Sequence, residues 1–279
     1  MSTQTPINSE AAEASAPRGG SGTTLPRVMR SEWTKLFSLR STGWTLSALV
    51  VATVGLGILA SWGTNHGWPQ ASASERADFD PVSTSLSGLA LGQLAIAVLG
   101  TLTISAEYST GGIRATLSTV PNRMMLLAAK AIVFTVVSLV VGLATSFAAF
   151  FAGQPWFAER GIGASLGDHG VLRAVIGGGL YIAASGLFGL AMGVLLRRTA
   201  GAVTAAVAAL LVLPGLTNIL PGSWGDAVVR YFTSNAGQQI SYVHQSGNYL
   251  TPWVGFGVYC LWWAIPLAFG AWLMNRRDA

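Results

Sequence analysis

The residues able to bind metals or catalyse reactions are few in this chain, and their spacing suits neither task. The three histidines are His66, His169 and His244, and the single cysteine is Cys260. Metal sites use closely spaced sets such as HExxH or CxxC, and the sequence contains neither. It also lacks the SxxK and paired-carboxylate patterns of hydrolases. We therefore predict no metal site, no catalytic residue and no cofactor bound by this chain.

Nucleotide binding and ion coupling also lack support from the charged residues. A P-loop needs GxxxxGK[ST], but the two lysines, Lys35 and Lys130, follow Thr34 and Ala129. Ion-coupled carriers and intramembrane hydrolases place ionisable groups within apolar spans, whereas the apolar cores of the long hydrophobic runs here carry none. The most polar side chains at depth are amides such as Gln93, which favour an interhelical hydrogen bond. These features favour a passage or a scaffold over an enzyme.

One elaborate polar segment, residues 104–130, connects two hydrophobic runs: ISAEYSTGGIRATLSTVPNRMMLLAAK. Glu107 and Tyr108 end the first run, and Gly111 permits a sharp turn because glycine accepts backbone conformations that other residues avoid. A short amphipathic helix is predicted from about residue 112 to 119, before Pro121. Its apolar face comprises Ile113, Leu117 and Val120, whereas Arg114, Thr116 and Ser118 lie elsewhere. The segment is either a handle tethered between two spans or a solvated loop that Glu107 anchors at the interface.

The composition indicates that membrane-spanning helices position this segment. The chain is 51% hydrophobic and only 10% charged, and its mean hydropathy is +0.52. A soluble domain has about 25% charged residues. An apolar helix needs about 20 residues to cross the hydrocarbon layer. We predict an all-α integral membrane protein with six spans at 43–62, 83–104, 126–151, 174–196, 199–220 and 250–274.

The basic residues predict the orientation of these spans. Twelve of the 16 Lys and Arg residues fall before the first span, in the second-to-third and fourth-to-fifth connections, and after the last span. An excess of Lys and Arg marks the cytoplasmic side, so both termini are expected there. The sequence pI of about 9.8 then reflects topology and attraction to anionic lipid, and no nucleic-acid partner is expected.

The residues before the first span divide into two parts. Residues 1–24 are rich in Ser, Thr, Ala, Gly and Pro and are predicted to be disordered, which leaves 25–279 as one six-helix transmembrane domain. In the next segment, apolar residues recur at helical spacing, with Arg30 and Lys35 mostly off that stripe and Trp33 on it. This pattern predicts a helix on the inner membrane surface, either as an anchor for the first span or as a docking element for a partner.

Small residues and one long outer loop indicate how the spans pack. Gly189 and Gly193 form a GxxxG pattern, with Ser185 one turn earlier, and small residues let helix backbones approach closely in lipid. The pattern predicts packing within the chain, with a subunit interface as the alternative. The loop at 221–249 is long and partly apolar, so it is expected to form short helices that dip back between the spans.

Three stretches of the chain resemble the permease subunits of ABC-2 type exporters, in the form common in actinobacteria. They are SEWTKLFSLRSTGWTL, AEYSTGGIRATLSTVPNRMMLLAAKA and RYFTSNAGQQI, and the likeness extends over nearly the whole chain after residue 25. The most specific part is E-Y-x-x-G-x-I-R-x-T-L…P-x-R…L-x-x-K. This chain meets that pattern with Glu107, Tyr108, Gly111, Ile113, Arg114, Thr116, Leu117, Pro121, Arg123, Leu127 and Lys130.

The resemblance implies a bacterial plasma-membrane permease that pairs with a second copy or a paralogue. A separate cytoplasmic ATPase would use ATP and Mg, and it would contact two elements of this chain. The implied coupling helix follows the second span and includes Glu107, Tyr108, Gly111, Ile113, Arg114 and Leu117. The implied connecting helix precedes the first span and includes Arg30, Trp33 and Lys35. The resemblance also implies re-entrant helices before the last span.

The predicted function is therefore the membrane-spanning, substrate-path subunit of an ATP-driven exporter. An uncharged path suits amphiphilic cargo. Two other function classes stay open at the level of sequence: an ATPase-independent channel or secondary carrier, and a non-transporting membrane scaffold or sensor. The first would move solute without any ATPase, and the second would bind a partner without changing cargo flux.

Overall fold

The computed structural model describes residues 24–109, 111–112, 122–217, 219–244, 247 and 249–276, and within these residues it contains helices and no β-strand. The predicted all-helical fold is confirmed for these residues, and six helical segments are long and apolar enough to cross a membrane, the number of spans predicted. These segments are Arg40–Gln70, Leu89–Ser109, Arg123–Ala158, Val171–Leu196, Thr199–Thr217 and Pro252–Arg276. Of the tail predicted to be disordered, residues 1–23 lie outside the described residues.

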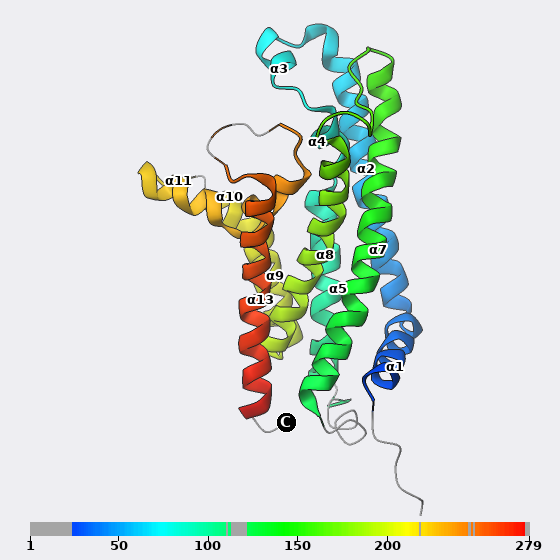
Figure 1. The fold of residues 1–279 in the computed structure, drawn as a ribbon, viewed down its shortest axis with the longest axis vertical. Coiled ribbons are helices and arrows are strands. Elements are labelled where there is room, and N and C mark those ends of the chain that lie inside the picture. The colour runs from blue at the N-terminus through cyan, green and yellow to red at the C-terminus, as the bar shows by residue number, and fades with distance from the viewer. Residues whose placement is uncertain are drawn as a thin grey trace, which may run out of the picture.

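The elements follow one another along the chain as shown in Figure 1. They are α1 (Leu25–Ser38), α2 (Arg40–Gly67), η2 (Trp68–Gln70), α3 (Ala73–Ala77), α4 (Pro81–Ser85), α5 (Leu89–Ser109), α7 (Arg123–Ala158), α8 (Val171–Leu196), α9 (Thr199–Val207), η3 (Ala208–Val212), α10 (Leu213–Thr217), α11 (Gly222–Tyr231), α12 (Thr233–Gly237), η4 (Gln238–Ser241) and α13 (Pro252–Arg276). We call the end of the bundle that carries α1 the α1 end and the opposite end the α3 end. The described chain begins and ends at the α1 end (Figure 1).

Five of the six spans begin at residues other than those predicted, and polar caps accompany two of these differences. The second span was expected at 83–104, but α5 begins at Leu89 after the separate helix α4. The Asp80 carboxylate caps α4 by accepting a hydrogen bond from the Val82 amide at 2.9 Å. The third was expected at 126–151, but α7 begins at Arg123, one residue after Asn122, whose side chain accepts from the Met125 amide at 3.0 Å.

Helix α8 forms the centre of the bundle and packs against α5, α7 and α13. In its apolar stretch 83% of the residues are buried, against 17% in that of α2 and 22% in that of α13. A helix that is apolar all round suits such a central position. Helices α2, α10 and α13 carry large exposed apolar side chains, such as Val51, Leu213 and Leu261, which suit contact with lipid or with another subunit.

Helix α1 packs along the start of α7, and the chain turns into α2 at Leu39, whose extended backbone separates the two helices (Figure 1). The face buried against the bundle consists of Val28, Glu32 and Leu36, which recur every fourth residue. The aromatic side chain of Trp33 lies on the exposed surface instead, 46% exposed. The predicted amphipathic helix is therefore present, and its buried face includes an acidic residue.

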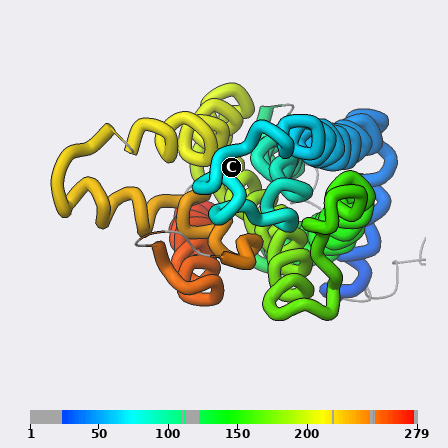
Figure 2. The backbone as a smooth tube through the Cα atoms, turned by 90° about the horizontal axis from the view of Figure 1, so that it is seen from above, coloured from blue at the N-terminus to red at the C-terminus, as the bar shows by residue number. Residues whose placement is uncertain are grey.

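The predicted short helices of the outer loop are present as α11, α12 and η4. In Figures 1 and 2, α11 projects sideways from the bundle, whereas α12 and η4 lie against α8 and α13. Thr233 begins α12 and donates a hydrogen bond to the Ala209 carbonyl at 2.7 Å, and Ser234 donates to the Leu210 carbonyl at 3.0 Å. These bonds attach the buried segment to the fifth span.

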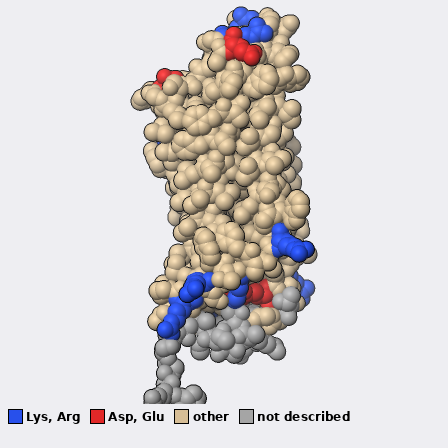
Figure 3. Space-filling view, turned by 90° about the vertical axis from the view of Figure 1, so that its right-hand side faces the viewer, with Lys and Arg blue, Asp and Glu red and all other residues tan. Residues whose placement is uncertain are grey.

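Charged side chains gather at the two ends of the bundle. On the face shown in Figure 3, Lys, Arg, Asp and Glu lie near the top and bottom, and a wide uncharged band separates them. At the α3 end, Asn65 donates to a Glu159 carboxylate oxygen at 2.7 Å and accepts from Arg160 at the same distance. An uncharged band between two polar ends is the pattern expected of a multi-pass membrane protein.

Candidate functional site

An ion cluster at the α1 end joins three helices that are distant in the sequence. Glu32 and Lys35 lie on α1, Glu107 lies near the end of α5, and Lys130 lies in the second turn of α7. Glu32 shares the buried face of α1 with Val28 and Leu36, so it points into the bundle. The cluster therefore forms where α1 is docked against the second and third spans.

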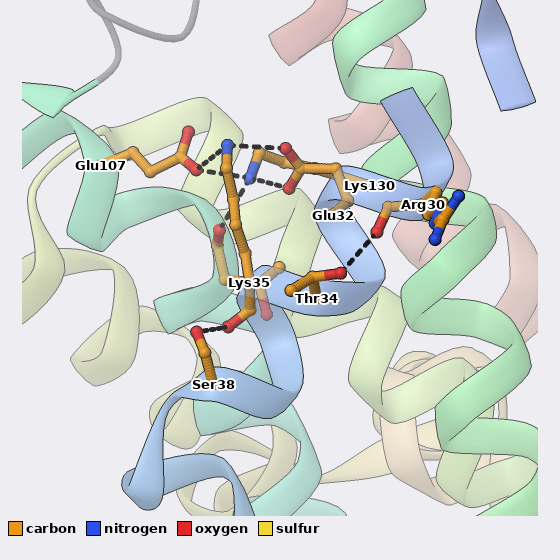
Figure 4. Close-up of polar contacts among 8 residues, drawn as sticks. Arg30, Glu32, Thr34, Lys35, Ser38, Glu107 and Lys130 are labelled. Atoms are coloured by element: carbon orange, nitrogen blue, oxygen red, sulfur yellow. Dashed lines mark hydrogen bonds and ion pairs between the residues drawn. The ribbon is translucent and has the colours of Figure 1, made fainter. Parts of the chain in front are cut away.

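The four charges alternate in sign. Lys130 Nζ lies 2.5 Å from Glu32 Oε2 and 2.8 Å from Glu107 Oε1, and it also donates to the Thr103 carbonyl at 3.4 Å. Lys35 Nζ lies 2.8 Å from Glu32 Oε1 and 3.3 Å from Glu107 Oε1. Figure 4 shows the two ammonium groups between the two carboxylates. The cluster is neutral as a whole.

Because the cluster is buried, its charges are compensated only when α1, α5 and α7 lie in the observed arrangement. The side chains of Lys130 and Glu32 are 1% and 5% exposed, and that of Glu107 is 18% exposed. Removing one member of a buried ion pair costs about 3–5 kcal/mol because its partner stays buried and uncompensated. Any displacement of α1 away from α5 and α7 would separate Glu32 from Lys130 and would incur a cost of the same kind.

Lys35 completes the cluster from its solvent side. Burial lowers the pKa of its ammonium group, but the hydrogen bond to Glu32 and the charge of Glu107 outweigh that effect and raise the pKa above the ordinary 10.5. Lys35 therefore stays charged throughout the neutral range, and it is 42% exposed.

The predicted coupling residues fall partly within the described structure. Glu107 and Tyr108 occupy the last turn of α5, and the guanidinium of Arg197 lies 5.1 Å from the centre of the Tyr108 ring. Gly111 has a φ of 72°, the left-handed conformation that favours glycine. Residues 113–119 of the predicted helix, including Ile113, Arg114 and Leu117, lie outside the described residues.

Of the three residues predicted for the connecting helix, Lys35 alone takes part in the ion cluster. Arg30 is exposed, and its carbonyl accepts a hydrogen bond from Thr34 Oγ1 at 3.0 Å. Trp33 packs on Phe37 with 4.9 Å between ring centroids, on the outer surface of α1. The structure thus separates an exposed basic and aromatic face of α1 from the buried face that carries Glu32.

The two most buried charged side chains, Lys130 and Glu32, were not predicted as site residues from the sequence. Lys130 was expected to be a basic residue of the cytoplasmic connection, but its side chain is buried inside the bundle, where two carboxylates neutralise it. Glu32 was not among the predicted site residues. The signal was present, since Glu32 stands four residues after Val28 and four before Leu36, in the register of an apolar helix face.

The small residues of α8 lie against α5. A Cβ added to Gly189 would approach the Ala97 carbonyl oxygen to 1.9 Å, and one added to Gly193 would approach the Thr101 carbonyl oxygen to 2.7 Å. Thr101 Oγ1 donates to the Gly189 carbonyl at 2.9 Å. In the described chain this face of α8 is thus occupied by α5 and is closed to another subunit.

A second polar cluster, uncharged, lies deeper between α5, α8, η4 and α13. The Tyr181 hydroxyl donates to Gln93 and accepts from Gln238 Nε2 at 3.2 Å. Ser185, one turn along α8, pairs with the Tyr259 hydroxyl at 2.8 Å. Gln93 therefore makes the interhelical hydrogen bond that its position predicted. Among the described residues, no group of three or more His, Cys, Asp or Glu could hold a metal ion.

Comparison with known proteins gives no family assignment, because no protein-family model and no curated protein matches this chain. The function must therefore be argued from the spans, the ion cluster and the residues around it.

Proposed function

We propose that this protein is the membrane-spanning permease subunit of an ATP-driven exporter of the ABC-2 type, in the plasma membrane of a bacterium. The α1 end faces the cytoplasm in this proposal, and two permease chains form the substrate path for an amphiphilic cargo. The chain binds no nucleotide itself. A separate cytoplasmic ATPase binds ATP and Mg and acts on the connection between α5 and α7.

The observation that carries the proposal is the ion cluster on both sides of this connection. Glu107 lies just before the connection, Lys130 lies just after it, and Glu32 joins both to α1. A force on the connection would therefore reach α1, α5 and α7 together. A solvated loop does not require ion pairs that join its two flanking helices to α1. A segment on which a separate ATPase acts does require them, because they pass its displacement on to the spans.

The proposed mechanism follows from this mechanical unit. When the ATPase subunits close on ATP, they displace the α5–α7 connection, and the ion cluster transmits that motion to α1. Helix α1 continues into α2 at Leu39 after one extended residue, so its displacement changes the tilt of the first span. Alternation between two such arrangements would open the path to either side in turn.

Purification tests the proposal directly. The chain is extracted from native membranes in mild detergent, and the proteins that accompany it are identified by mass spectrometry. A P-loop ATPase is expected, and Leu117→Asp should release it because this change puts a charge on the predicted apolar face of the coupling helix. The matched control is Ile219→Asp, at an exposed apolar residue that follows the fifth span, which should retain the ATPase.

Two results would contradict the proposal. One is a chain that purifies intact but alone, under conditions that preserve a known membrane complex, and that conducts or exchanges solute in liposomes without an ATPase. This result would favour the channel or carrier. The other is a bound ATPase whose hydrolysis moves no solute in reconstituted vesicles that contain native membrane extract, which would favour the scaffold or sensor. Glu107 is unsuitable for this test because its replacement also breaks the ion cluster.

A further inference from the structure

A cavity of about 440 Å³ lies beside the ion cluster, under the corner between α1 and α2. Its apolar wall comprises Leu36 and Leu39 from this corner and Leu99, Leu102 and Ala106 from α5. Its polar residues include Thr42 near the start of α2 and all four members of the ion cluster. The cavity is thus apolar over most of its wall and charged at one end, which is the shape of a site for an amphiphile.

Two polar atoms of residues that line this cavity lack a hydrogen-bond partner among the described residues. They are Glu107 Oε2 and Thr42 Oγ1, and both atoms are buried. Thr42 is 1% exposed. Glu107 uses its other oxygen, Oε1, for both lysines. Buried polar atoms are normally hydrogen-bonded, and a polar group bound in the cavity would supply the missing partners.

The types of these atoms restrict what that group can be. A carboxylate oxygen only accepts hydrogen bonds, so the ligand must donate one to Glu107 Oε2. The cluster already balances two carboxylates with two ammonium groups, so a cationic donor would fit best if an anionic group accompanied it. A shallow groove next to the cavity shares Lys35 and Ser38 with it and adds Arg27 and Arg30. This basic groove suits the anionic group.

We propose that this cavity binds an amphiphile with a primary ammonium group, which donates to Glu107 Oε2 and lies near Thr42. The hydrocarbon part lies along Leu99, Leu102 and Ala106, and a phosphate, where present, lies toward Lys35 and Arg27. The ligand would be either a zwitterionic aminophospholipid or a free amine-bearing amphiphile. The proposal rests on the cavity alone and does not require an ATPase partner.

The test compares headgroups on the intact full-length chain in detergent. Dioctanoyl phosphatidylethanolamine carries N–H donors, whereas dioctanoyl phosphatidylcholine has the same chains and phosphate without any. Binding is measured by native mass spectrometry, with decylamine as the lipid-free amine. We expect the ethanolamine lipid to bind about tenfold more tightly than the choline lipid, the factor for one charge-assisted hydrogen bond. Equal binding of the two lipids, with no binding of decylamine, would overturn the proposal.

The amine probes also distinguish the two sources of ligand. If the ethanolamine lipid displaces decylamine at a lower concentration than decylamine needs to displace the lipid, the site is a lipid site. If decylamine is the stronger competitor, the ligand is a free amine-bearing amphiphile. Ala106→Phe places a ring in the cavity without removing a charge and should reduce binding of both probes at least about tenfold. The matched control is Ala200→Phe on exposed α9, which should leave binding unchanged. Unreduced binding to a folded Ala106→Phe chain would place the amphiphile elsewhere and contradict the assignment.

Discussion

The two buried polar clusters of this bundle use different chemistry. At the α1 end, four charged side chains join a peripheral helix to two spans. Deeper in the bundle, the cluster around Tyr181 joins α5, α8, η4 and α13 through uncharged hydroxyl and amide groups. A charged side chain far from water must be paired with an opposite charge, whereas a neutral hydroxyl or amide group needs only a hydrogen-bond partner. The contrast shows that the charged contacts lie toward the end of the bundle, whereas the contacts deeper in it are neutral.

The energies of the two clusters should differ accordingly. Loss of a partner in the charged cluster strands a buried charge, at a cost of about 3–5 kcal/mol. Hydrogen bonds between helices in membranes contribute less, about 0.6 kcal/mol on average. The charged cluster therefore holds α1 in one specific position, and the neutral cluster adds smaller increments to a core that close packing already defines. Four substitutions test this comparison.

The largest effect is expected from Lys130→Met. This change removes the ammonium group that both Glu32 and Glu107 contact, and should lower the free energy of unfolding by about 3–5 kcal/mol. Unfolding by denaturing detergent, followed by circular dichroism, measures it. Adding Glu32→Gln should recover part of the loss because it restores a neutral cluster. The control Arg198→Met removes an exposed cation and should change stability by less than about 0.5 kcal/mol. Equal losses for both single variants would refute the special status of the charged cluster.

The second test measures the contribution of close backbone packing between α5 and α8, and the substituted residue carries no polar side chain. In Gly189→Ala, the new methyl group meets the Ala97 carbonyl oxygen at 1.9 Å, so α5 and α8 must separate. We expect a loss of about 2 kcal/mol, within the range for overpacked cores. Gly55→Ala is the matched control, because its Cβ meets nothing within 4 Å and alanine favours the helix by up to about 1 kcal/mol. A harmless Gly189→Ala would mean that α8 does not need this close approach.

The sequence was sufficient for the general architecture because hydrophobic length and charge composition are local properties. Six spans, the turn at Gly111, the helix before the first span and the short helices of the outer loop all follow from such patterns. The range of the second span was wrong because Asp80 caps a separate short helix, and apolar composition alone cannot place that break.

The composition of the charged cluster could not be predicted in the same way. Glu32 and Glu107 lie 75 positions apart in the chain, and only tertiary packing brings both to Lys130. A basic residue near the end of a span is typical of the cytoplasmic surface, so the sequence predicted an exposed Lys130. The structure instead buries its side chain between two carboxylates. Glu32 gave a weak signal of its own, an acid in the register of a buried apolar face.

Tyr181→Phe tests the neutral cluster and should have a smaller effect than either change above. It removes the hydroxyl that donates to Gln93 and accepts from Gln238, so two buried hydrogen bonds disappear. The expected loss is about 1–2 kcal/mol, since each interhelical bond contributes about 0.6 kcal/mol and the stranded amides add to that cost. Tyr249→Phe, at an exposed tyrosine, is the control. A loss as large as that of Lys130→Met would remove the distinction between the two clusters.

The smallest effect is expected from Lys35→Gln, at the solvent side of the charged cluster. Lys35 is 42% exposed, so water screens its contacts with Glu32 and Glu107, and the loss should stay below about 1 kcal/mol.

The pKa of Lys35 is raised in the folded protein, so its contribution is fully present below the unfolded value of 10.5 and is lost as pH rises through the folded pKa. The stability difference between the unchanged chain and Lys35→Gln should therefore be constant at neutral and mildly alkaline pH and should shrink above about pH 10.5. Arg30→Gln, on the exposed face of α1, should show no such pH dependence. A loss for Lys35→Gln comparable to that for Lys130→Met would mean that charge itself, rather than its burial, holds α1 in place.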